Sequence, residues 1–209
     1  MKIMNRSGRP RKEESNSDSR SEIINAAARL ISRKGTNSLT VRAVCEEAQL
    51  SIGTFYYFFK DKNDLMMSFI TDLSFEEAEL SCPLSDISGR IAELYMLLIQ
   101  RYMNFGREFV RSFYNPCNIV LSAYMGERDG MFPKGTVMAR SEKELDDALA
   151  QGVIALPDDI TVHEIASDIC TVVKGCVFEW CLSDNIVDLN ALTERIIRSY
   201  MLKLQTSTG

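Results

Sequence analysis

Residues 40–65 read TVRAVCEEAQLSIGTFYYFFKDKNDL, and this stretch decides the fold of the N-terminal part of the chain. Thr40 and Ser51 are residue types that favour the N-cap position, and each precedes apolar residues at helical spacing. Leu39 and Leu50 stand just before the two caps, where each can form a hydrophobic staple with a residue inside its helix. Two short capped helices separated by a turn of about three residues predict a helix-turn-helix.

A longer helix is expected to precede this pair. Residues 19–22 (SRSE) fit the S-x-x-E capping box, and apolar residues recur at helical spacing from Ile23 to Ile31. Gly35 follows two basic residues and can adopt the left-handed conformation that ends a helix. The three helices together predict a small domain over residues 20–65.

The composition of the third helix, expected over residues 52–59, favours contact with DNA. The base-reading end of a recognition helix must approach the groove closely. The first turn here is small enough to do so and consists of Ser51, Ile52, Gly53 and Thr54. The three phenylalanines that follow are expected to pack inward, which leaves the hydroxyl groups of the two tyrosines between them for phosphate oxygens. The alternative is an aromatic three-helix domain without a ligand.

Charge is divided unequally along the chain. The 209 residues carry 24 Lys and Arg against 29 Asp and Glu, a net charge of -5, which excludes a histone-like protein that binds by bulk charge. Residues 1–64 nevertheless hold 12 basic and 8 acidic side chains, whereas residues 65–209 hold 12 and 21. The N-terminal part is therefore the one suited to a polyanion.

Residues 1–19 are expected to form a flexible basic arm, because they lack hydrophobic periodicity and are rich in small polar residues. Arg9 and Arg11 flank Pro10, which keeps the backbone extended. An extended cationic strand fits the minor groove of A·T-rich DNA. A basic tail that only keeps the protein in solution fits the same residues.

The segment TVRAVCEEA at 40–48, followed by SIGTFYYFFKDKNDL at 51–65, resembles the DNA-binding signature of the TetR family of transcriptional regulators. The resemblance begins near Ile23. It implies a dimeric repressor or activator in which Thr40 and Tyr56 contact phosphates, Thr54 and its neighbours face bases, and Lys62 lies at the phosphate-facing start of the next helix. The expected DNA-contacting residues are Arg9, Arg11, Thr40, Arg42, Ser51, Ile52, Gly53, Thr54, Tyr56, Tyr57, Lys60 and Lys62.

Two residues depart from the family pattern. Phe58 stands where the family commonly has histidine, which removes one potential phosphate contact. Gln49 stands where glycine is frequent, so a positive φ at this position would be strained.

The rest of the chain, residues 66–209, predicts a larger helical domain, so the fold class is all-α. Asp61 is expected to cap a helix that ends near Leu80. Further helices are expected over about 85–114, 137–154, 162–182 and 189–204, from apolar residues at helical spacing. The helix over 137–154 has an acidic outer face that includes Glu144. This domain is expected to bind an effector and to form the dimer.

Aromatic residues concentrate on the helix over 85–114, where they form either plain core or the wall of a cavity. Arg101, Arg107 and Arg111 interleave with them and would favour an anionic or carbonyl-bearing ligand, unless they belong to a solvated helix face. The cavity interpretation gives these candidate ligand contacts: Tyr95, Leu98, Tyr102, Phe105, Phe109, Phe113, Tyr124, Val173 and Val177.

The last two expected helices carry more apolar residues than one buried face needs. Such a pair can form a four-helix bundle with a second copy across a two-fold axis, and the TetR resemblance implies the same interface. The expected interface residues are Ile169, Cys176, Trp180, Leu192, Ile196 and Tyr200.

Several classes of function are not supported. Six cysteines without a C-x-x-C pair and a single histidine, His163, give no metal-site spacing, and we expect no metal and no cofactor. No phosphate loop or catalytic motif indicates an enzyme. We expect no membrane span and no secretory signal, and hence a cytoplasmic protein. The thiols are expected to be reduced and buried, with a redox sensor as the alternative, and His163 is expected at the surface.

These features predict a sequence-specific DNA-binding regulator. Its partners would be a double-stranded DNA operator, a second copy of the chain and a small-molecule effector. The most direct interpretation is a repressor that leaves its operator when a small, largely apolar or aromatic ligand binds the C-terminal domain. The alternative is a DNA-binding regulator controlled by thiol oxidation or by a protein partner.

Overall fold

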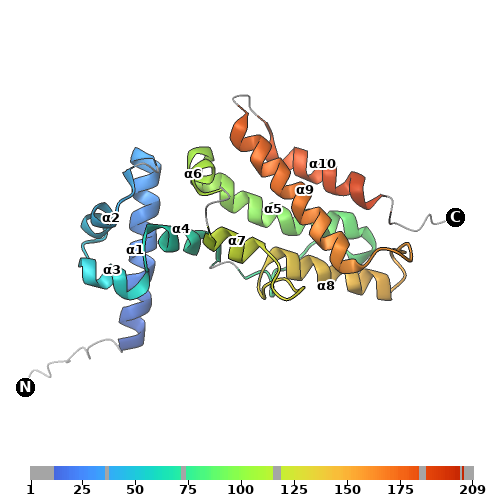
Figure 1. Ribbon diagram of the computed structural model, residues 1–209, viewed down its shortest axis with the longest axis horizontal. Coiled ribbons are helices and arrows are strands. Elements are labelled where there is room, and N and C mark those ends of the chain that lie inside the picture. Colours follow the sequence, from blue (N-terminus) through green and yellow to red (C-terminus); the bar gives the residue numbers. More distant parts are fainter. Residues whose placement is uncertain are drawn as a thin grey trace, which may run out of the picture. The chain divides into compact units, whose positions relative to one another are not determined.

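The computed structural model describes residues 12–35, 38–71, 74–114, 119–183, 187–202 and 204, with the backbone alone described at 12–17, 70, 112, 113, 119 and 120. The chain divides into two compact units, with the boundary after Leu65. The regular elements of the described residues are helical, which confirms the all-α prediction (Figure 1). Within those residues, no helix is both long enough and apolar enough to cross a membrane.

The N-terminal unit contains α1 (Lys12–Lys34), α2 (Val41–Ala48) and α3 (Ile52–Phe58). Each of the three helices packs against the other two. The prediction that a helix begins at the capping box over 19–22 is wrong, because α1 is already helical from Lys12. The acidic residues that follow Lys12 favour an early helix start, since negative charge near the N-terminus stabilises the helix dipole.

The caps predicted for the short helices are confirmed. The Thr40 hydroxyl accepts a hydrogen bond from the amide of Ala43 at 3.1 Å, and the Ser51 hydroxyl accepts one from the amide of Thr54 at 3.0 Å. Gly35 ends α1 with a φ of 74°. These side chains bind amide groups that the helices themselves leave unsatisfied, so each helix start is set by one polar side chain.

The next helix, α4 (Lys62–Thr71), is shorter than predicted and contains the boundary between the two units. Asp61 caps it as expected, because one carboxylate oxygen accepts hydrogen bonds from the amides of Asn63 and Asp64 at 2.7 and 2.9 Å.

The C-terminal unit is built around α5 (Ile87–Phe105), which packs against α6, α8 and α10. A second long helix, α9 (Val162–Leu182), packs against the same three helices (Figure 1). The remaining elements of this unit are a 3-10 helix, η2 (Leu84–Asp86), and the helices α6 (Arg107–Phe113), α7 (Ile119–Met125), α8 (Val137–Ala150) and α10 (Leu189–Met201).

The helix predicted over 85–114 is interrupted at Gly106. This residue has a φ of 80° and a ψ of 158°, a conformation that other residues rarely adopt, and it separates α5 from α6. Hydrophobic spacing continues across the break, so the periodicity did not reveal it. The helix α7 was not predicted at all.

Glu144 is buried, so its assignment to an acidic outer face was wrong. Its carboxylate accepts hydrogen bonds from Arg90 of α5 and from Arg140, the latter at 2.7 Å. Burial opposes the charged form, but the two guanidinium groups outweigh it and lower the pKa of Glu144. Arg140 also donates to the carbonyl oxygen of Phe75 at 3.1 Å, so the charge network fixes the segment after α4.

His163 is partly exposed near the surface, where its ring has partners within the same unit. Its Nδ1 lies 2.7 Å from a carboxylate oxygen of Glu142, and its Nε2 lies 3.5 Å from one of Glu127. The ring stacks on Phe132 with a centroid separation of 4.4 Å. The hydrogen bond with Glu142, supported by the Glu127 carboxylate, raises the pKa of His163.

This arrangement predicts a pH-dependent stability of the C-terminal unit. Because the pKa of His163 is raised on folding, its contribution is fully present below the unfolded pKa of about 6.5 and is lost as the pH rises through the folded value. His163→Gln should remove that part of the pH dependence. The fluorescence of Trp180, the only tryptophan, measured during urea unfolding at a series of pH values, tests this.

Glu142→Gln should reduce the same pH dependence, because it removes the carboxylate nearest to the imidazole. Asp159→Asn, at an exposed acid, should leave it intact. An unchanged pH profile in His163→Gln would show that the ion cluster does not contribute to stability.

Candidate nucleic-acid interface and ligand cavity

The helix-turn-helix consists of α2, a short turn and α3. Gln49 lies in the turn with a φ of 56° and a ψ of 36°. This is the left-handed conformation, in which residues with a Cβ atom are strained. Its amide points back to the carbonyl oxygens of Cys45 and Glu46 at the end of α2. The strain expected from the departure at Gln49 is therefore present.

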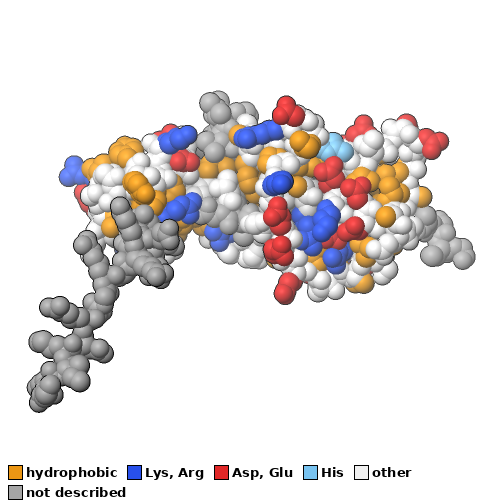
Figure 2. Space-filling model, turned by 90° about the horizontal axis from the view of Figure 1, so that it is seen from below, with side chains coloured by type: hydrophobic (Ala, Val, Ile, Leu, Met, Phe, Trp, Pro, Cys, Tyr) orange, Lys and Arg blue, Asp and Glu red, His pale blue; other side chains and the backbone are white. Residues whose placement is uncertain are grey.

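The buried side of α3 fixes the orientation of its exposed side. Phe55 and Phe59 are buried, whereas Phe58, also expected to pack inward, is partly exposed. The exposed fractions are 51% for Ile52, 56% for Tyr56 and 70% for Tyr57. Figure 2 shows hydrophobic side chains at the surface of the N-terminal unit. Large apolar groups exposed together on a short helix are typical of a contact surface.

The other predicted DNA contacts in the described residues are also accessible. Thr40, Arg42, Ser51, Gly53 and Lys60 are exposed, while Thr54 and Lys62 are partly exposed. Arg42 pairs with Glu46 at 2.9 Å on the surface of α2, an interaction weak enough to be exchanged for a phosphate. Arg9 and Arg11 lie outside the described residues.

Gly53 is not required by the packing of its own chain. A Cβ atom built at this position would meet only the Ser51 hydroxyl oxygen, at 3.6 Å, which is an ordinary contact. Its φ is not positive either, so alanine fits the backbone. A glycine inside a helix is destabilising by comparison with alanine. The packing and the backbone of the N-terminal unit therefore do not require a glycine at position 53.

The N-terminal unit, which we call the head, matches a known protein family. The profile of the bacterial regulatory proteins of the tetR family matches residues 23–68, which include α2, the turn and α3. Residues 23–68 form a TetR family helix-turn-helix domain.

Known regulators of this kind resemble the chain over most of its length. The nicotine-responsive transcriptional repressor HdnoR of Paenarthrobacter nicotinovorans is 23% identical over 190 residues, covering 82% of this chain and 93% of the repressor. The TetR family repressor FadR of Thermus thermophilus, solved with lauroyl-CoA, gives a TM-score of 0.57 at 15% identity and covers 91% of this chain and 97% of its own.

A third similar protein is TylP of Streptomyces fradiae, with a TM-score of 0.58 at 18% identity over 91% of this chain and 88% of its own. At such identities the solved structures establish a shared TetR fold. The similarity does not show which ligand this chain binds.

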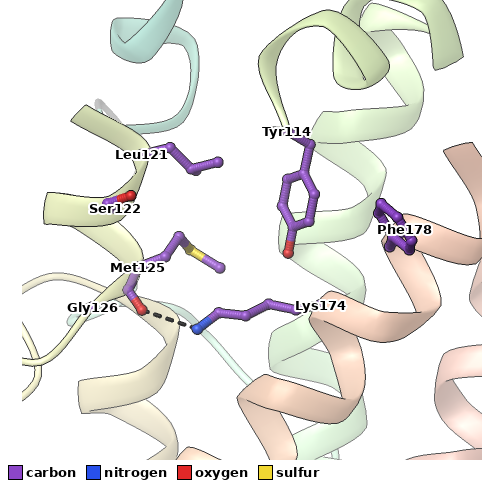
Figure 3. A pocket seen from close by; sticks show the side chains of 7 residues that line it. All are labelled: Tyr114, Leu121, Ser122, Met125, Gly126, Lys174 and Phe178. Carbon is purple, nitrogen blue, oxygen red and sulfur yellow. Dashed lines mark hydrogen bonds between the residues drawn. The ribbon is translucent and has the colours of Figure 1, made fainter. Parts of the chain in front are cut away.

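The C-terminal unit contains a cavity of about 330 Å³ between α7 and α9, beside the end of α6 (Figure 3). Leu121 and Met125 project into it from α7, and Lys174 and Phe178 project from α9. The complete lining is Tyr114, Leu121, Ser122, Met125, Gly126, Lys174 and Phe178. Mostly apolar walls with a few polar groups are typical of small-molecule sites.

The residues predicted to contact a ligand do not line this cavity. Most of them are buried in the core of the unit, namely Tyr95, Leu98, Tyr102, Phe109, Val173 and Val177. Phe105 and Tyr124 are partly exposed, and the side chain of Phe113 lies outside the description. The aromatic stripe is mainly core, because α5 is covered on several sides. The sequence signal that could have indicated the cavity is Lys174, a cation within an apolar stretch of α9.

The three arginines also have structural partners. Arg107 and Arg111 donate hydrogen bonds to the carbonyl oxygens of Ser183 and Cys181 at the C-terminal end of α9, at 2.6 and 2.8 Å. Arg101 donates to the carbonyl oxygen of Phe69 at 2.9 Å. Cations at a helix C-terminus stabilise the helix dipole. Neither a ligand site nor a purely solvated face accounts for these arginines.

The predicted interface residues fall into two groups. Ile169, Cys176 and Trp180 are buried by their own chain, so their assignment to a dimer surface is corrected. Leu192, Ile196 and Tyr200 of α10 are partly exposed and remain candidates. The exposed apolar residues of α9 are Phe178 and Leu182, which lie at helical spacing from the exposed Gly175. Periodicity alone did not distinguish these two faces of α9.

The strained turn gives a prediction for the TetR-type head. Gln49→Gly should stabilise the N-terminal unit by about 1 kcal/mol, because glycine adopts the left-handed conformation freely. Hydrogen exchange of the amides of α2 and α3 should slow by about fivefold. Gln49→Ala is the matched control and should show no such protection, since alanine retains the strain. Equal protection in both variants would contradict this account of the turn.

Proposed function

We propose that this TetR family regulator is a homodimeric repressor, acting in the cytoplasm, that binds a near-palindromic DNA site and is released when a small, largely apolar molecule binds the C-terminal unit. Each head would enter a major groove with the leading end of α3, and the two heads would lie about one helical turn of DNA or more apart.

The observation that carries the proposal is the combination of Gly53 with its exposed neighbours. The fold tolerates a side chain at Gly53, yet the position is empty on the face where Ile52 and Tyr56 are exposed. A surface that must approach base edges closely gives a physical reason for a residue without a side chain. Duplex DNA is the partner with which a helix-turn-helix makes such an approach.

Polar groups around this end of α3 suit the DNA backbone. The hydroxyl of Tyr56, the side chain of Thr40 and the amino group of Lys60 lie at exposed positions of the same head. Hydroxyl and ammonium groups commonly bind phosphate oxygens and fix the register of a protein on the duplex. We assign these three residues to phosphate contacts and Thr54, with Ile52 and Gly53, to the bases.

Control by a small molecule is supported by the cavity in the C-terminal unit. The similar repressor HdnoR is described as nicotine-responsive, and the cavity here has the apolar lining expected of a site for a small organic molecule. By linkage, an effector that lowers the affinity for DNA must itself be bound less tightly by the DNA complex, to the same degree.

Control by thiol oxidation has less support. Burial raises the pKa of each of the five described thiols, which are Cys45, Cys82, Cys170, Cys176 and Cys181. A redox-sensing cysteine needs a lowered pKa and access to oxidant. The described thiols have the opposite character.

A dimer surface is supported by the outer faces of α9 and α10. The Tyr200 hydroxyl donates a hydrogen bond to Asp168 of α9 at 2.8 Å, which places this row of α10 beside the exposed face of α9. Ile196 lies one turn from Tyr200 on the same row, and Leu182 is exposed on α9. Two such helices can pair with their symmetry copies in a four-helix bundle.

Replacing the glycine on α3 separates DNA binding from stability. Gly53→Ala should raise the stability of the head by up to about 1 kcal/mol, because alanine is the better helix former. The same change should weaken binding to DNA by about tenfold or more, because the methyl group prevents close approach. Fluorescence anisotropy on duplexes that the wild-type protein selects from a random pool measures the affinity.

Lys143→Ala, at an exposed position of α8 in the other unit, is the control and should leave the affinity unchanged. Wild-type affinity in Gly53→Ala, or the absence of any selected duplex, would refute the proposed contact with DNA.

Disrupting the outer face of α10 should dissociate the dimer. Ile196→Glu introduces a charge into an apolar contact, so analytical ultracentrifugation should show a monomer with weakened DNA binding, since the two heads then bind independently. Leu97→Glu is the matched control, because Leu97 is an exposed leucine of α5. A dimer that persists in Ile196→Glu would place the interface elsewhere.

A further inference from the structure

We infer that the effector site of the C-terminal unit recognises an apolar molecule with one anionic oxygen group, which Lys174 binds. The inference rests on the proposed function, since it takes the cavity between α7 and α9 as the effector site. It adds the chemical class of the effector and the residue that selects it.

Lys174 is the charged residue of the lining. Its ammonium group donates one hydrogen bond, to the carbonyl oxygen of Met125 at 3.1 Å, and closes one end of the cavity (Figure 3). An ammonium group has three donors. A second one faces the Cys170 thiol, so one remains for another acceptor. Within the described part of the chain, Lys174 forms no ion pair with a carboxylate. An anionic ligand is therefore the natural counter-charge.

Glu127 follows the lining residue Gly126, but its carboxylate contacts Ser167 and His163. One carboxylate oxygen accepts a hydrogen bond from Ser167 at 3.1 Å, and the other lies 3.5 Å from the imidazole of His163. Two other cations near α9, Arg107 and Arg111, are bound to the carbonyl oxygens that end the helix. Lys174 differs from these two arginines, because its charge faces the cavity and not the end of the helix.

The hydroxyl group of Tyr114 provides a further donor in the cavity lining. Tyr114 points its hydroxyl into the cavity (Figure 3), and its ring packs edge to face on Tyr102 at 6.4 Å. The hydroxyls of Tyr102 and Tyr124 are buried and have no hydrogen-bond partner among the described residues. Burial raises the pKa of all three, and that of Tyr124 to about 12, so they remain neutral donors. Of the three, Tyr114 lines the cavity and can donate to an acceptor of the ligand.

The remaining lining fits an apolar body. Leu121 and Met125 line the cavity from α7, and Phe178 lines it from α9 (Figure 3). A ligand with its anionic group at Lys174 would therefore place its apolar part against these side chains. A cationic ligand would be repelled by Lys174 without a carboxylate in the lining to compensate.

Two fluorescent probes test this inference with the full-length chain. Anilinonaphthalene sulfonate and N-phenylnaphthylamine share the same ring system, and only the former carries an anionic group. The wild-type protein should bind the sulfonate about tenfold more tightly than the neutral probe, the preference that one partly desolvated ion pair supplies. Lys174→Met should remove this preference and leave the affinity for the neutral probe equal or higher.

Three further variants make the result specific. Lys174→Arg keeps the charge and should keep the preference, so a general loss of structure is distinguished from a loss of charge. Lys143→Met, at an exposed lysine of α8, should change neither affinity. Ser122→Trp fills the cavity and should reduce the binding of both probes, which locates them in it.

The outcomes separate this inference from the proposed function. Equal affinity of the wild-type protein for both probes, or a preference that survives in Lys174→Met, would overturn the anionic class while leaving an apolar effector site in place. If neither probe bound in the cavity, the inference and the proposed effector site would both be overturned. A retained charge preference without any effect of the sulfonate on DNA binding would support the class and contradict release by an effector.

Discussion

The burial of Phe55 and Phe59 is the constraint on which the N-terminal unit depends. Phe55 lies within a helix only seven residues long and Phe59 is its C-cap, so their burial leaves the opposite side of α3 exposed, with Ile52, Tyr56 and Tyr57 at the surface. A helix this short is not stable by itself in water. The aromatic core therefore stabilises α3 and at the same time orients the surface that we assign to DNA.

The backbone of the turn before α3 is strained at Gln49. Gln49 holds a left-handed conformation and the caps at Thr40 and Ser51 fix the helix starts on either side of it. Strained backbone that persists in a folded protein is stabilised by its surroundings and is frequent at functional sites. Here the surroundings are the packed helices of the head, so the strain and the buried phenylalanines belong to one structural arrangement.

The C-terminal unit neutralises most of its internal charges with its own groups. Glu144 is paired with two arginines, His163 lies between two carboxylates, and Arg107 and Arg111 bind the end of α9. Buried or partly buried charges are costly unless paired, so these networks explain the location of most ionic side chains. Lys174 differs from them because its neighbours are a backbone carbonyl and an apolar cavity.

The sequence by itself determined the helix-turn-helix, its caps, the strain at Gln49 and the exposed tyrosines, because capping and helical spacing are local and involve residues a few positions apart. It did not determine the early start of α1, the break at Gly106, or which face of α9 is covered. Those features depend on which side chains from distant segments fill the space around α5 and α9. Tertiary packing alone decided that the aromatic stripe is core, that the arginines bind carbonyl oxygens, and that the cavity lies beside Lys174.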